Sequence, residues 1–414
     1  MKKLTIGILS YRSAPFSGGQ GIYVAEISRL LRDLGHKITV ISGPPYPHLD
    51  TGINLIKLPG LNLFSTFNFR DRLKKFLKKN PKSLDDYYEF FVALIGGFPE
   101  MRTFGNRAHK FIKPGDFDVL IDNQSLAFGL VAIQKHTPIL TVIHHPISKD
   151  RHFELFFSKS TIRRFFIKRW YGFLPMQKRV AKQMEQILTP SMNSRRDICD
   201  DFGVRESKIS VIPNGIDSSV FGPLNDRKDF SNNFRIITTA SADVPLKGLS
   251  YTIKAIDLLR ERFPKIHLTV IGQPKSGGYT ERLIDELNIS DFISFKTNLT
   301  KDEIVFEYAC SSIAVVSSLY EGFGFPVGEA MACNVPLVAT NVASIPEITS
   351  TFATLINSES SSEIAEAIEE IFSDYSFFQQ RAFQGMMHIK ENFNWAKIAI
   401  DYEDLLYRVI NKRC

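Results

Sequence analysis

Two glutamates enclose a glycine-containing turn in the stretch EGFGFPVGE, which runs from Glu321 to Glu329. A buried strand is predicted over Ile313–Ser317, and a helix is predicted to begin near Pro326–Val327 with Glu329 in its first turn. Free N–H groups at a helix N-terminus attract anions, and glycines let a ligand approach the backbone closely. Glu329 could accept two adjacent hydroxyl groups, as in a ribose, and Glu321 could accept those of another ring. The stretch therefore predicts a site for an anionic, hydroxylated ligand.

A structural role would explain either glutamate alone. Glu329 would favour the helix dipole, and Glu321 would be a surface turn residue. That explanation does not account for two acids and two glycines on one edge where a ligand could bind. We therefore favour the binding interpretation for the stretch as a whole.

The N-terminus shows the elements that would carry a second ligand-binding edge. A strand over Leu4–Leu9, a glycine-containing loop over Ser10–Gly21, a helix over Ile22–Leu34 and a strand over Lys37–Ile41 open a doubly wound parallel sheet. The glycines do not fit the GxGxxG fingerprint of a dinucleotide site, and no acid closes the second strand. This loop is therefore expected to meet a ligand in another way than an NAD-binding loop does.

At this point the residues resemble a known family. EGFGFPVGE looks like the E-x7-E signature of retaining glycosyltransferases of the GT-B fold, the large family 4 group. Three further stretches resemble the same family: VIPNGIDSSVF (Val211–Phe221), PLKG (Pro245–Gly248) and the segment Ser17–Ser42. The resemblance implies an α/β fold of two Rossmann-like doubly wound parallel-sheet domains that face a cleft. It also implies a nucleotide-sugar donor and the transfer of a hexosyl group.

Length agrees with two domains, because single cores stop growing near ~250–300 residues and this chain has 414. We place an N-terminal acceptor-binding domain at residues 1–213 and a C-terminal nucleotide-sugar-binding domain at 214–394. The linker is placed at Ser218–Asn233. The last helix, residues 395–414, is expected to cross back to the first domain, as in the family.

The resemblance assigns the donor site. Lys247 resembles the family's phosphate-binding lysine. The backbone of the N-terminal glycine loop resembles the one that approaches the donor diphosphate. The donor-binding residues implied are Gly18, Gly19, Gly272, Gly322, Phe323, Gly324, Phe325 and Glu329. One departure stands out: where the family usually has an arginine, this chain has Ala242, with Asp243 beside it. The missing cation weakens the expected hold on a diphosphate.

The acceptor side is assigned to polar residues at two predicted strand ends in the first domain. A strand over Phe117–Asp122 ends in DNQS, so Asp122 and Asn123 are expected to hold the acceptor. A strand over Ile139–Ile143 ends in His144 and His145. His144 resembles the family's acceptor-side histidine, and His145 is assigned to acceptor binding; a structural histidine bonded to a neighbouring loop is the alternative.

The implied chemistry stabilises negative charge on a departing diphosphate. We expect a front-face mechanism in which the phosphate oxygen takes the acceptor proton, with His144, Glu321 and Lys247 as the catalytic set. A second catalytic carboxylate is not required. No cofactor and no metal are expected: Asp116-Phe117-Asp118 fits the D-x-D pattern of metal-dependent transferases, but it precedes a buried strand and is interpreted as a turn.

Composition suggests a possible membrane partner. The net charge is +7, and basic residues cluster among aromatic ones near residues 64–82 and 153–173. Such interleaving suits an anionic membrane surface, although a solvated basic face over a core of aromatics would look the same. No nucleic-acid motif accompanies it. Four unpaired-looking cysteines and the absence of a long apolar run predict a cytoplasmic protein, peripheral at most on the inner face of the membrane.

Two other functions remain open from the sequence. A nucleotide-sugar 2-epimerase of the same fold would interconvert the donor without an acceptor. A non-catalytic nucleotide-sugar-binding protein would follow if the residue at 242 has disabled the site. Neither the sugar, the base, the acceptor nor the oligomeric state is indicated by residue spacing.

Overall fold

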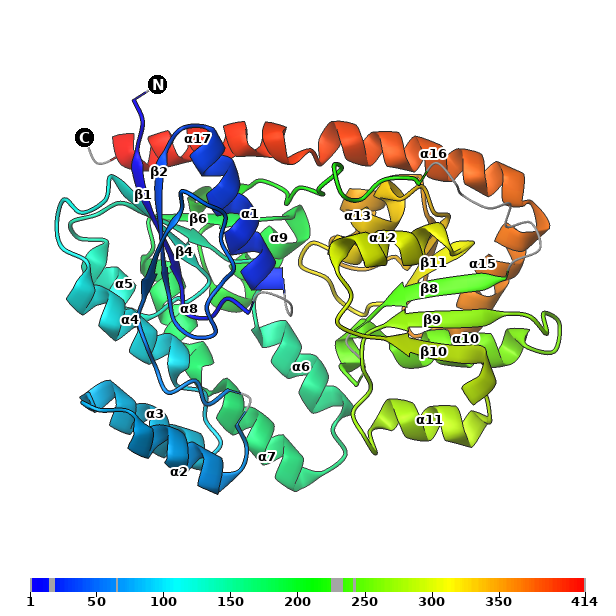
Figure 1. The fold of residues 1–414 in the computed structure, drawn as a ribbon, viewed down its shortest axis with the longest axis horizontal. Helices are drawn as coiled ribbons and strands as arrows, with labels where there is room; N and C mark the ends of the chain where they lie inside the picture. The colour runs from blue at the N-terminus through cyan, green and yellow to red at the C-terminus, as the bar shows by residue number, and fades with distance from the viewer. Residues whose placement is uncertain (1, 15–18, 65, 225–233, 241–242, 413–414) are drawn as a thin grey trace. The chain divides into compact units, whose positions relative to one another are not determined.

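The computed structural model describes residues 2–14, 19–64, 66–224, 234–240 and 243–412. The chain forms two α/β units, each built around its own parallel sheet (Figure 1). Unit 1 contains Met1–Pro190, Ser194–Ile212 and Ala396–Cys414, and unit 2 contains Ser191–Asn193 and Pro213–Trp395. The predicted fold class, two Rossmann-like parallel-sheet domains, is confirmed.

In the described part of unit 1, seven parallel strands pair in the order β3-β2-β1-β4-β5-β6-β7. Ile6 pairs with Ile38 of β2 and with Val119 of β4, so the order reverses around β1. The strands read as nearly continuous apolar runs because helices cover both faces of such a sheet. They are β1 Thr5–Ser10, β2 Lys37–Ser42, β3 Asn54–Lys57, β4 Val119–Asn123, β5 Ile139–Val142, β6 Gln186–Thr189 and β7 Ile209–Val211.

The helices of unit 1 include the last helix of the chain. Tyr402 of α17 places its hydroxyl 2.6 Å from that of Tyr23 on α1, and Glu403 lies 2.9 Å from the buried His36. The unit contains α1 Gly19–Asp33, α2 Phe69–Lys78, α3 Leu84–Leu94, α4 Glu100–Phe111, α5 Phe128–Ile133, α6 Ser148–Phe157, α7 Thr161–Trp170, α8 Leu174–Gln183, α9 Met192–Phe202 and α17 Trp395–Asn411, with short 3-10 turns at Tyr171–Phe173 and Glu206–Lys208.

The sheet of unit 2 has six parallel strands among the described residues, in the order β10-β9-β8-β11-β12-β13. The strands are β8 Arg235–Thr239, β9 His267–Ile271, β10 Ile293–Lys296, β11 Ile313–Val316, β12 Leu337–Thr340 and β13 Thr354–Ile356. The helices are α10 Leu249–Leu259, α11 Tyr279–Leu287, α12 Lys301–Ala309, α13 Phe325–Ala332, α14 Ile345–Thr349, α15 Ser361–Ser373 and α16 Tyr375–Asn392, with 3-10 turns at Pro245–Lys247 and Ser290–Phe292.

Among the described residues, none of the helices has both the length and the apolar character that a membrane span requires. The first core cluster packs against one face of the unit 1 sheet and includes Leu9, Ile41 and Leu120. Two clusters lie in unit 2, one of which contains Ile236 and Val315 and the other Val316 and Val327. The last of these supports the turn that follows β11.

Candidate active site

The turn after β11 accepts hydrogen bonds from residues at the end of β12 and just beyond it. Ser344 donates its hydroxyl to the carbonyl oxygens of Glu321 (2.8 Å) and Phe323 (2.7 Å). Thr340, the last residue of β12, donates to the carbonyl oxygen of Ser318 at 2.5 Å. These bonds satisfy turn carbonyls that would otherwise lie buried without partners. The turn is therefore rigid before any ligand arrives.

Helix α13 begins directly from this turn. Its N-cap is Gly324, whose φ of +105° lies in the left-handed region that favours glycine. The helix starts at Phe325, so Pro326 is its second residue and Glu329 lies in its second turn. The prediction that Glu329 stands in the first turn is wrong by one turn, because the glycine cap starts the helix one residue earlier.

The structure brings together two of the predicted catalytic residues. Lys247 Nζ lies 2.7 Å from Glu321 Oε1, and Ser318 donates its hydroxyl to the same oxygen at 2.7 Å. Glu321 is only 8% exposed, so it needs these partners. A lysine ammonium has three N–H donors, so Lys247 keeps two for other acceptors.

A glycine fixes the position of Lys247. Gly248 has φ +63°, and a Cβ at this position would lie 1.9 Å from the carbonyl oxygen of Ser317. Leu319 donates its backbone N–H to the carbonyl oxygen of Leu246 at 2.7 Å. The PLKG turn therefore packs directly against the end of β11, which explains why the glycine follows the lysine.

Glu329 differs from Glu321 in its contacts with the described residues. It is half-buried, and the structure records no hydrogen bond to its carboxylate from any described residue. Burial raises its pKa to about 7, although the charge of Lys301 works in the opposite direction. Tyr308 lies close enough for the Glu329 charge to raise the tyrosine pKa, and its hydroxyl is 3.1 Å from that of Thr239.

Of the other predicted donor-binding residues, Gly322 and Phe323 are buried, whereas Gly272 is half-buried. The Phe323 ring is 5% exposed and packs against Phe325 and Phe393 at centroid distances of 5.2 and 6.0 Å. It belongs to the core, so only its backbone could reach a ligand, as is true of the buried Gly322. Gly272 follows β9 and donates its N–H to Lys296 of β10.

Asp243 does not stand free beside the lysine loop. Its carboxylate accepts the backbone N–H groups of Lys275 and Thr280, each at 2.8 Å. Burial would raise its pKa, but these hydrogen bonds outweigh that effect and lower it. The acid thus anchors the loop after β9. Two predicted positions, Gly18 and Ala242, lie outside the described residues, and Gly19 is the exposed first residue of α1.

In unit 1, the predicted acceptor histidine makes contacts through both its ring and its backbone. His144 Nε2 lies 2.8 Å from Asn123 Oδ1, and its backbone N–H donates to Gln124 Oε1 at 2.8 Å. Its ring meets that of Tyr23 edge-on at 4.7 Å. Burial, and secondarily the charge of His145, lowers its pKa to about 3. His144 is therefore neutral near pH 7, with its proton on Nε2 facing the asparagine oxygen.

Asp122 does not have the exposure expected of an acceptor ligand. It is fully buried, and its carboxylate accepts the side chain and backbone of Ser125 and the N–H of Leu126. Burial raises its pKa to about 6. These bonds close the turn after β4 and engage both carboxylate oxygens, which argues against the predicted role of Asp122 in holding the acceptor. Asn123 is also buried and acts through His144.

One residue that the sequence interpretation missed holds both histidines. Gln124 accepts from the backbone of His144 and donates Nε2 to the carbonyl oxygen of His145 at 2.7 Å. The His145 ring in turn lies 2.7 Å from Asp150 Oδ2. The signal was the position of Gln124 in DNQS, after a strand end, but a glutamine there is not diagnostic.

Both aspartates of the D-x-D stretch accept hydrogen bonds from backbone N–H groups. Asp116 accepts the N–H of Lys113 and Asp118 that of Thr5, both at 2.7 Å. Both lie at the amino end of β4, opposite the carboxyl edge that carries His144. Among the described residues, no group of three or more His, Cys, Asp or Glu side chains could hold a metal ion.

Comparison with known proteins agrees with this geometry. The model "Glycosyltransferase Family 4" matches residues 17–220, and "Glycosyl transferases group 1" matches residues 224–384. The chain is 37% identical to the MMP alpha-(1->4)-mannosyltransferase of Mycolicibacterium hassiacum, over 98% of this chain and 99% of that one. It is 23% identical to the mannosylfructose-phosphate synthase of Agrobacterium fabrum, over 78% and 71% of the two chains.

Solved structures share the fold at low sequence identity. The sucrose-phosphate synthase from Thermosynechococcus elongatus superposes with a TM-score of 0.74 at 18% identity, covering 99% of this chain and 100% of that one. Anabaena Alr3699/HepE, solved with UDP and glucose, gives 0.70 at 18% identity, covering 98% and 99%. The chain therefore belongs to glycosyltransferase family 4, and it is a glycosyltransferase with the GT-B fold.

Proposed function

We propose that the enzyme transfers a hexosyl group, in the first place mannosyl, from a nucleotide-diphosphate sugar to a hydroxyl of a saccharide or lipid-linked acceptor, with retention of configuration. The observation that carries the proposal is the Lys247–Glu321 pair at 2.7 Å, whose glutamate precedes the glycine-capped α13, the helix that carries Glu329 in its second turn. Lys247, Glu321 and Glu329 match the three parts of such a donor: diphosphate, hexose and ribose.

Each residue of unit 2 takes a distinct part of the donor. Lys247 uses its remaining N–H donors on the diphosphate, together with the backbone N–H of Phe325, the first residue of α13. Pro326 has no N–H, and those of Val327 and Gly328 donate to the carbonyl oxygen of Gly324. Glu329 accepts the two ribose hydroxyls, which fits a half-buried carboxylate with no bonds from described residues. Glu321, fixed by Lys247 and Ser318, orients the hexose rather than attacking it.

The reaction is a front-face displacement. The acceptor oxygen bonds to the anomeric carbon, the bond from that carbon to the phosphate oxygen breaks, and the departing phosphate oxygen takes the acceptor proton. The products are the glycoside and the nucleoside diphosphate. Lys247 and the backbone N–H of Phe325 stabilise the charge on the leaving group, and we expect no metal to be required. His144, neutral at pH 7, contributes hydrogen bonding on the acceptor side and not a positive charge.

The choice of mannose and of a saccharide acceptor draws on relatives. The 37% identical relative is named as an alpha-(1->4)-mannosyltransferase. An α-linked product from an α-linked nucleotide donor is retention. Both UDP- and GDP-sugars remain candidate donors, because one structural neighbour was solved with UDP.

A thermal-shift panel with GDP-mannose, UDP-glucose, ADP-glucose and dTDP-glucose tests the donor, with NAD as the control. A ligand at 100 times its Kd stabilises by about 2.7 kcal/mol, and we expect one nucleotide class alone to do so. The donor that binds is then incubated with a panel of oligosaccharides in EDTA, and the new anomeric proton is identified by NMR. An inverted product, loss of turnover in EDTA, or silence from every nucleotide sugar would contradict the proposal.

A further inference from the structure

Helix α3 in unit 1 presents its apolar side to solvent. Its buried residues include Asp85, Asp86 and Glu89. Its exposed residues are Leu84 (86% exposed), Tyr87, Tyr88, Phe91 (61%), Leu94 and the C-cap Ile95 (55%). These positions are spaced i, i+3, i+4, i+7, i+10 and i+11, which places them on one face of the helix. A surface helix normally has the opposite arrangement.

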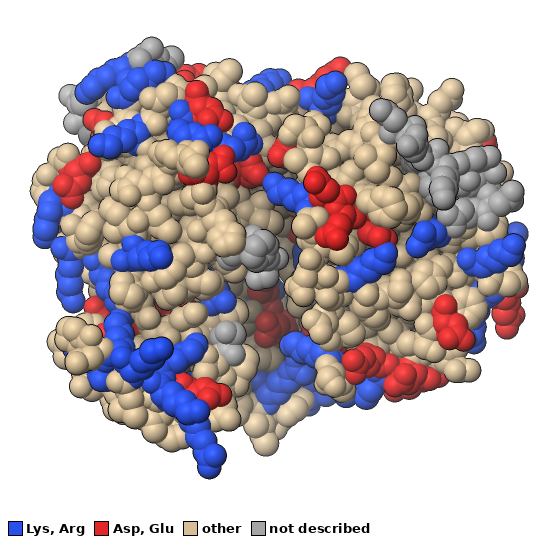
Figure 2. Space-filling model, viewed as in Figure 1, with Lys and Arg blue, Asp and Glu red and all other residues tan. Residues whose placement is uncertain are grey.

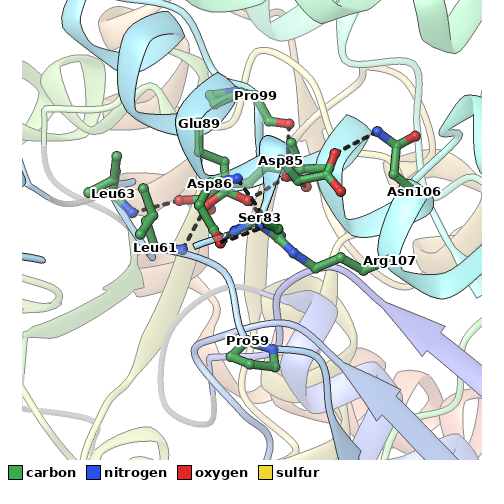
Figure 3. A network of polar contacts seen from close by, with 12 residues as sticks. Pro59, Leu61, Leu63, Ser83, Asp85, Asp86, Glu89, Pro99, Asn106 and Arg107 are labelled. Atoms are coloured by element: carbon green, nitrogen blue, oxygen red, sulfur yellow. Dashed lines mark hydrogen bonds and ion pairs between the residues drawn. The ribbon is translucent and has the colours of Figure 1, made fainter. Parts of the chain in front are cut away.

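The acids that point inward explain why the helix is fixed this way round. Arg107 of α4 reaches Asp86 at 2.9 Å and Glu89 at 2.6 Å, and Lys79 reaches Asp86 at 2.5 Å. Figure 3 shows Asp86, Glu89 and Arg107 close together in this network. Rotating the helix to bury its apolar side would break this network and expose the loop it holds. The apolar side therefore faces solvent in the stable fold.

Helix α7 extends the same surface. Ile162, Phe165 and Phe166 are 70%, 59% and 51% exposed and are spaced i, i+3 and i+4, whereas Ile167 is buried. Phe166 adjoins the end of α3, because a Cβ on Gly96 would lie 2.9 Å from its ring. We call the exposed apolar residues of α3 and α7 together the α3–α7 face. Several other aromatics of the second basic block, namely Trp170, Tyr171 and Phe173, pack into the core instead.

Basic residues outnumber acidic ones along the border of this face, where Asp71 of α2 is an exposed acid. Helix α7, with the sequence TIRRFFIKRW, has four basic residues and no acidic one, and Arg163 and Lys168 are exposed. On the neighbouring α2 the exposed basic residues are Arg70, Lys74 and Lys78, while Arg72, Lys75 and Lys79 turn inward to bind backbone carbonyls. Lys and Arg gather over the region of α2 and α3 in the space-filling view (Figure 2).

We propose that the α3–α7 face docks onto the surface of an anionic lipid bilayer. Aromatic and aliphatic side chains enter the headgroup boundary, and the bordering lysines and arginines pair with anionic lipid phosphates. A second copy of the chain is a poorer occupant, because a two-fold contact would bring the same basic residues of both copies together. The proposal is independent of the donor chemistry, since binding to lipid needs no turnover.

Vesicle co-sedimentation of the full chain tests this surface. We expect binding to phosphatidylcholine vesicles with 30% phosphatidylglycerol, little binding to phosphatidylcholine alone, and release by 0.5 M NaCl. The triple variant Leu84→Ser/Phe91→Ser/Ile95→Ser should bind at least tenfold more weakly, and Arg163→Glu/Lys168→Glu should show a similar loss. The matched control is Leu258→Ser/Phe377→Ser/Phe383→Ser, three apolar residues of unit 2 with comparable exposure, which should bind like the wild type.

Three results would overturn the proposal. The first is no binding of the wild type to anionic vesicles at low salt. The second is equal binding by the α3 triple variant and the wild type. The third, from sedimentation velocity without lipid, is a wild-type dimer that the α3 variant dissolves, which would show that a second copy covers the face. Donor binding and transfer to a soluble acceptor, measured on the same samples, report separately on the proposed function.

Discussion

Each unit contains a set of buried or half-buried carboxylates, and the two sets differ in their hydrogen-bond partners. In unit 1, helices α3 and α4 contribute the buried acids Asp85, Asp86, Glu89 and Glu100, the first three of which are drawn in Figure 3. In unit 2, the turn and helix after β11 contribute Glu321 and Glu329. A buried acid is costly in either place, so the difference lies in what surrounds it.

The unit 1 acids are mostly saturated by the protein. Glu89 accepts from Thr103 (2.5 Å), Arg107 (2.6 Å) and the backbone N–H of Leu61 (2.7 Å). Glu100 accepts the N–H groups of Leu63 and Phe64, although its second oxygen has only the Arg12 guanidinium at 3.8 Å. Glu89 and Glu100 therefore hold the loop at residues 61–64 through its backbone N–H groups.

Glu329 in unit 2 differs by having no hydrogen bond from a described residue. A raised pKa alone does not mark it out, because burial also raises the pKa of Glu100 to about 7, with the charge of Glu89 adding to the effect. Hydrogen-bond partners make the distinction. A buried acid whose oxygens are taken by backbone and arginine is structural, and one whose oxygens are open is available to a ligand.

The largest effect should follow from removing the shared cation of the unit 1 set. Arg107→Ala leaves Asp86 and Glu89 without a guanidinium that each contacts within 3 Å. We expect the free energy of unfolding to fall by about 3–5 kcal/mol, the cost of breaking a buried ion pair from one side. Urea denaturation measures it. Arg102→Ala, on the exposed side of the same helix, should cost under about 0.5 kcal/mol; equal losses would show that the network is not special.

Local signals were enough to predict most elements. Helix α12 is an example, because Thr300 and Glu303 form a capping box that is visible in the sequence. The glycine turn before Glu329 was predicted from another local signal, the glycines between the two glutamates. The contact between Lys247 and Glu321, in contrast, joins residues 74 positions apart and depends on the order of the strands that carry them.

The side of a helix that faces the core was harder to predict than the position of the helix in the sequence. Nothing in the local sequence of α3 says which side of the helix faces inward. The apolar spacing of Leu84, Tyr87, Tyr88 and Phe91 alone would turn that side to the core. Arg107, which holds the acids inward instead, lies on another helix. Similarly, Asp122 was predicted to bind the acceptor because it lies at a strand end. Its hydrogen bonds with Ser125 and Leu126 close a turn that only the structure shows.

Glu329→Ala should weaken donor binding without harming the fold. Two charge-assisted hydrogen bonds to the ribose are lost, so we expect about 2–3 kcal/mol, or roughly 30–150-fold in Kd. Isothermal titration with the donor identified by the thermal-shift panel measures the change. Glu366→Ala, an exposed glutamate on α15, is the control and should leave Kd unchanged. Unaltered affinity in Glu329→Ala would remove the ribose assignment.

The ionised Glu329 should lower the free energy of unfolding when no donor is bound. The folded-state pKa of Glu329, about 7, lies above the ordinary value of 4.5, so the native state holds the extra proton between these pH values. Stability therefore falls as pH rises through this window, and the full penalty is present above pH 7. Glu329→Gln should raise stability at pH 8 by about 1–3 kcal/mol and change it little near pH 4.5. A variant less stable than wild type at pH 8 would mean that the carboxylate has a partner after all.

The smallest effect concerns Asp122, whose partners are all neutral. In Asp122→Asn one oxygen becomes an amide that cannot accept from Ser125 or Leu126, so we expect a loss of about 1–2 kcal/mol in the free energy of unfolding. The kcat/KM of the folded enzyme should stay within twofold of wild type, because the buried side chain cannot reach an acceptor. Asp200→Asn, an exposed change on α9, controls for the loss of one charge. A rise in the KM for the acceptor, with stability unchanged, would instead place Asp122 among the residues that bind substrate, and partner saturation would then fail to separate structural from functional carboxylates.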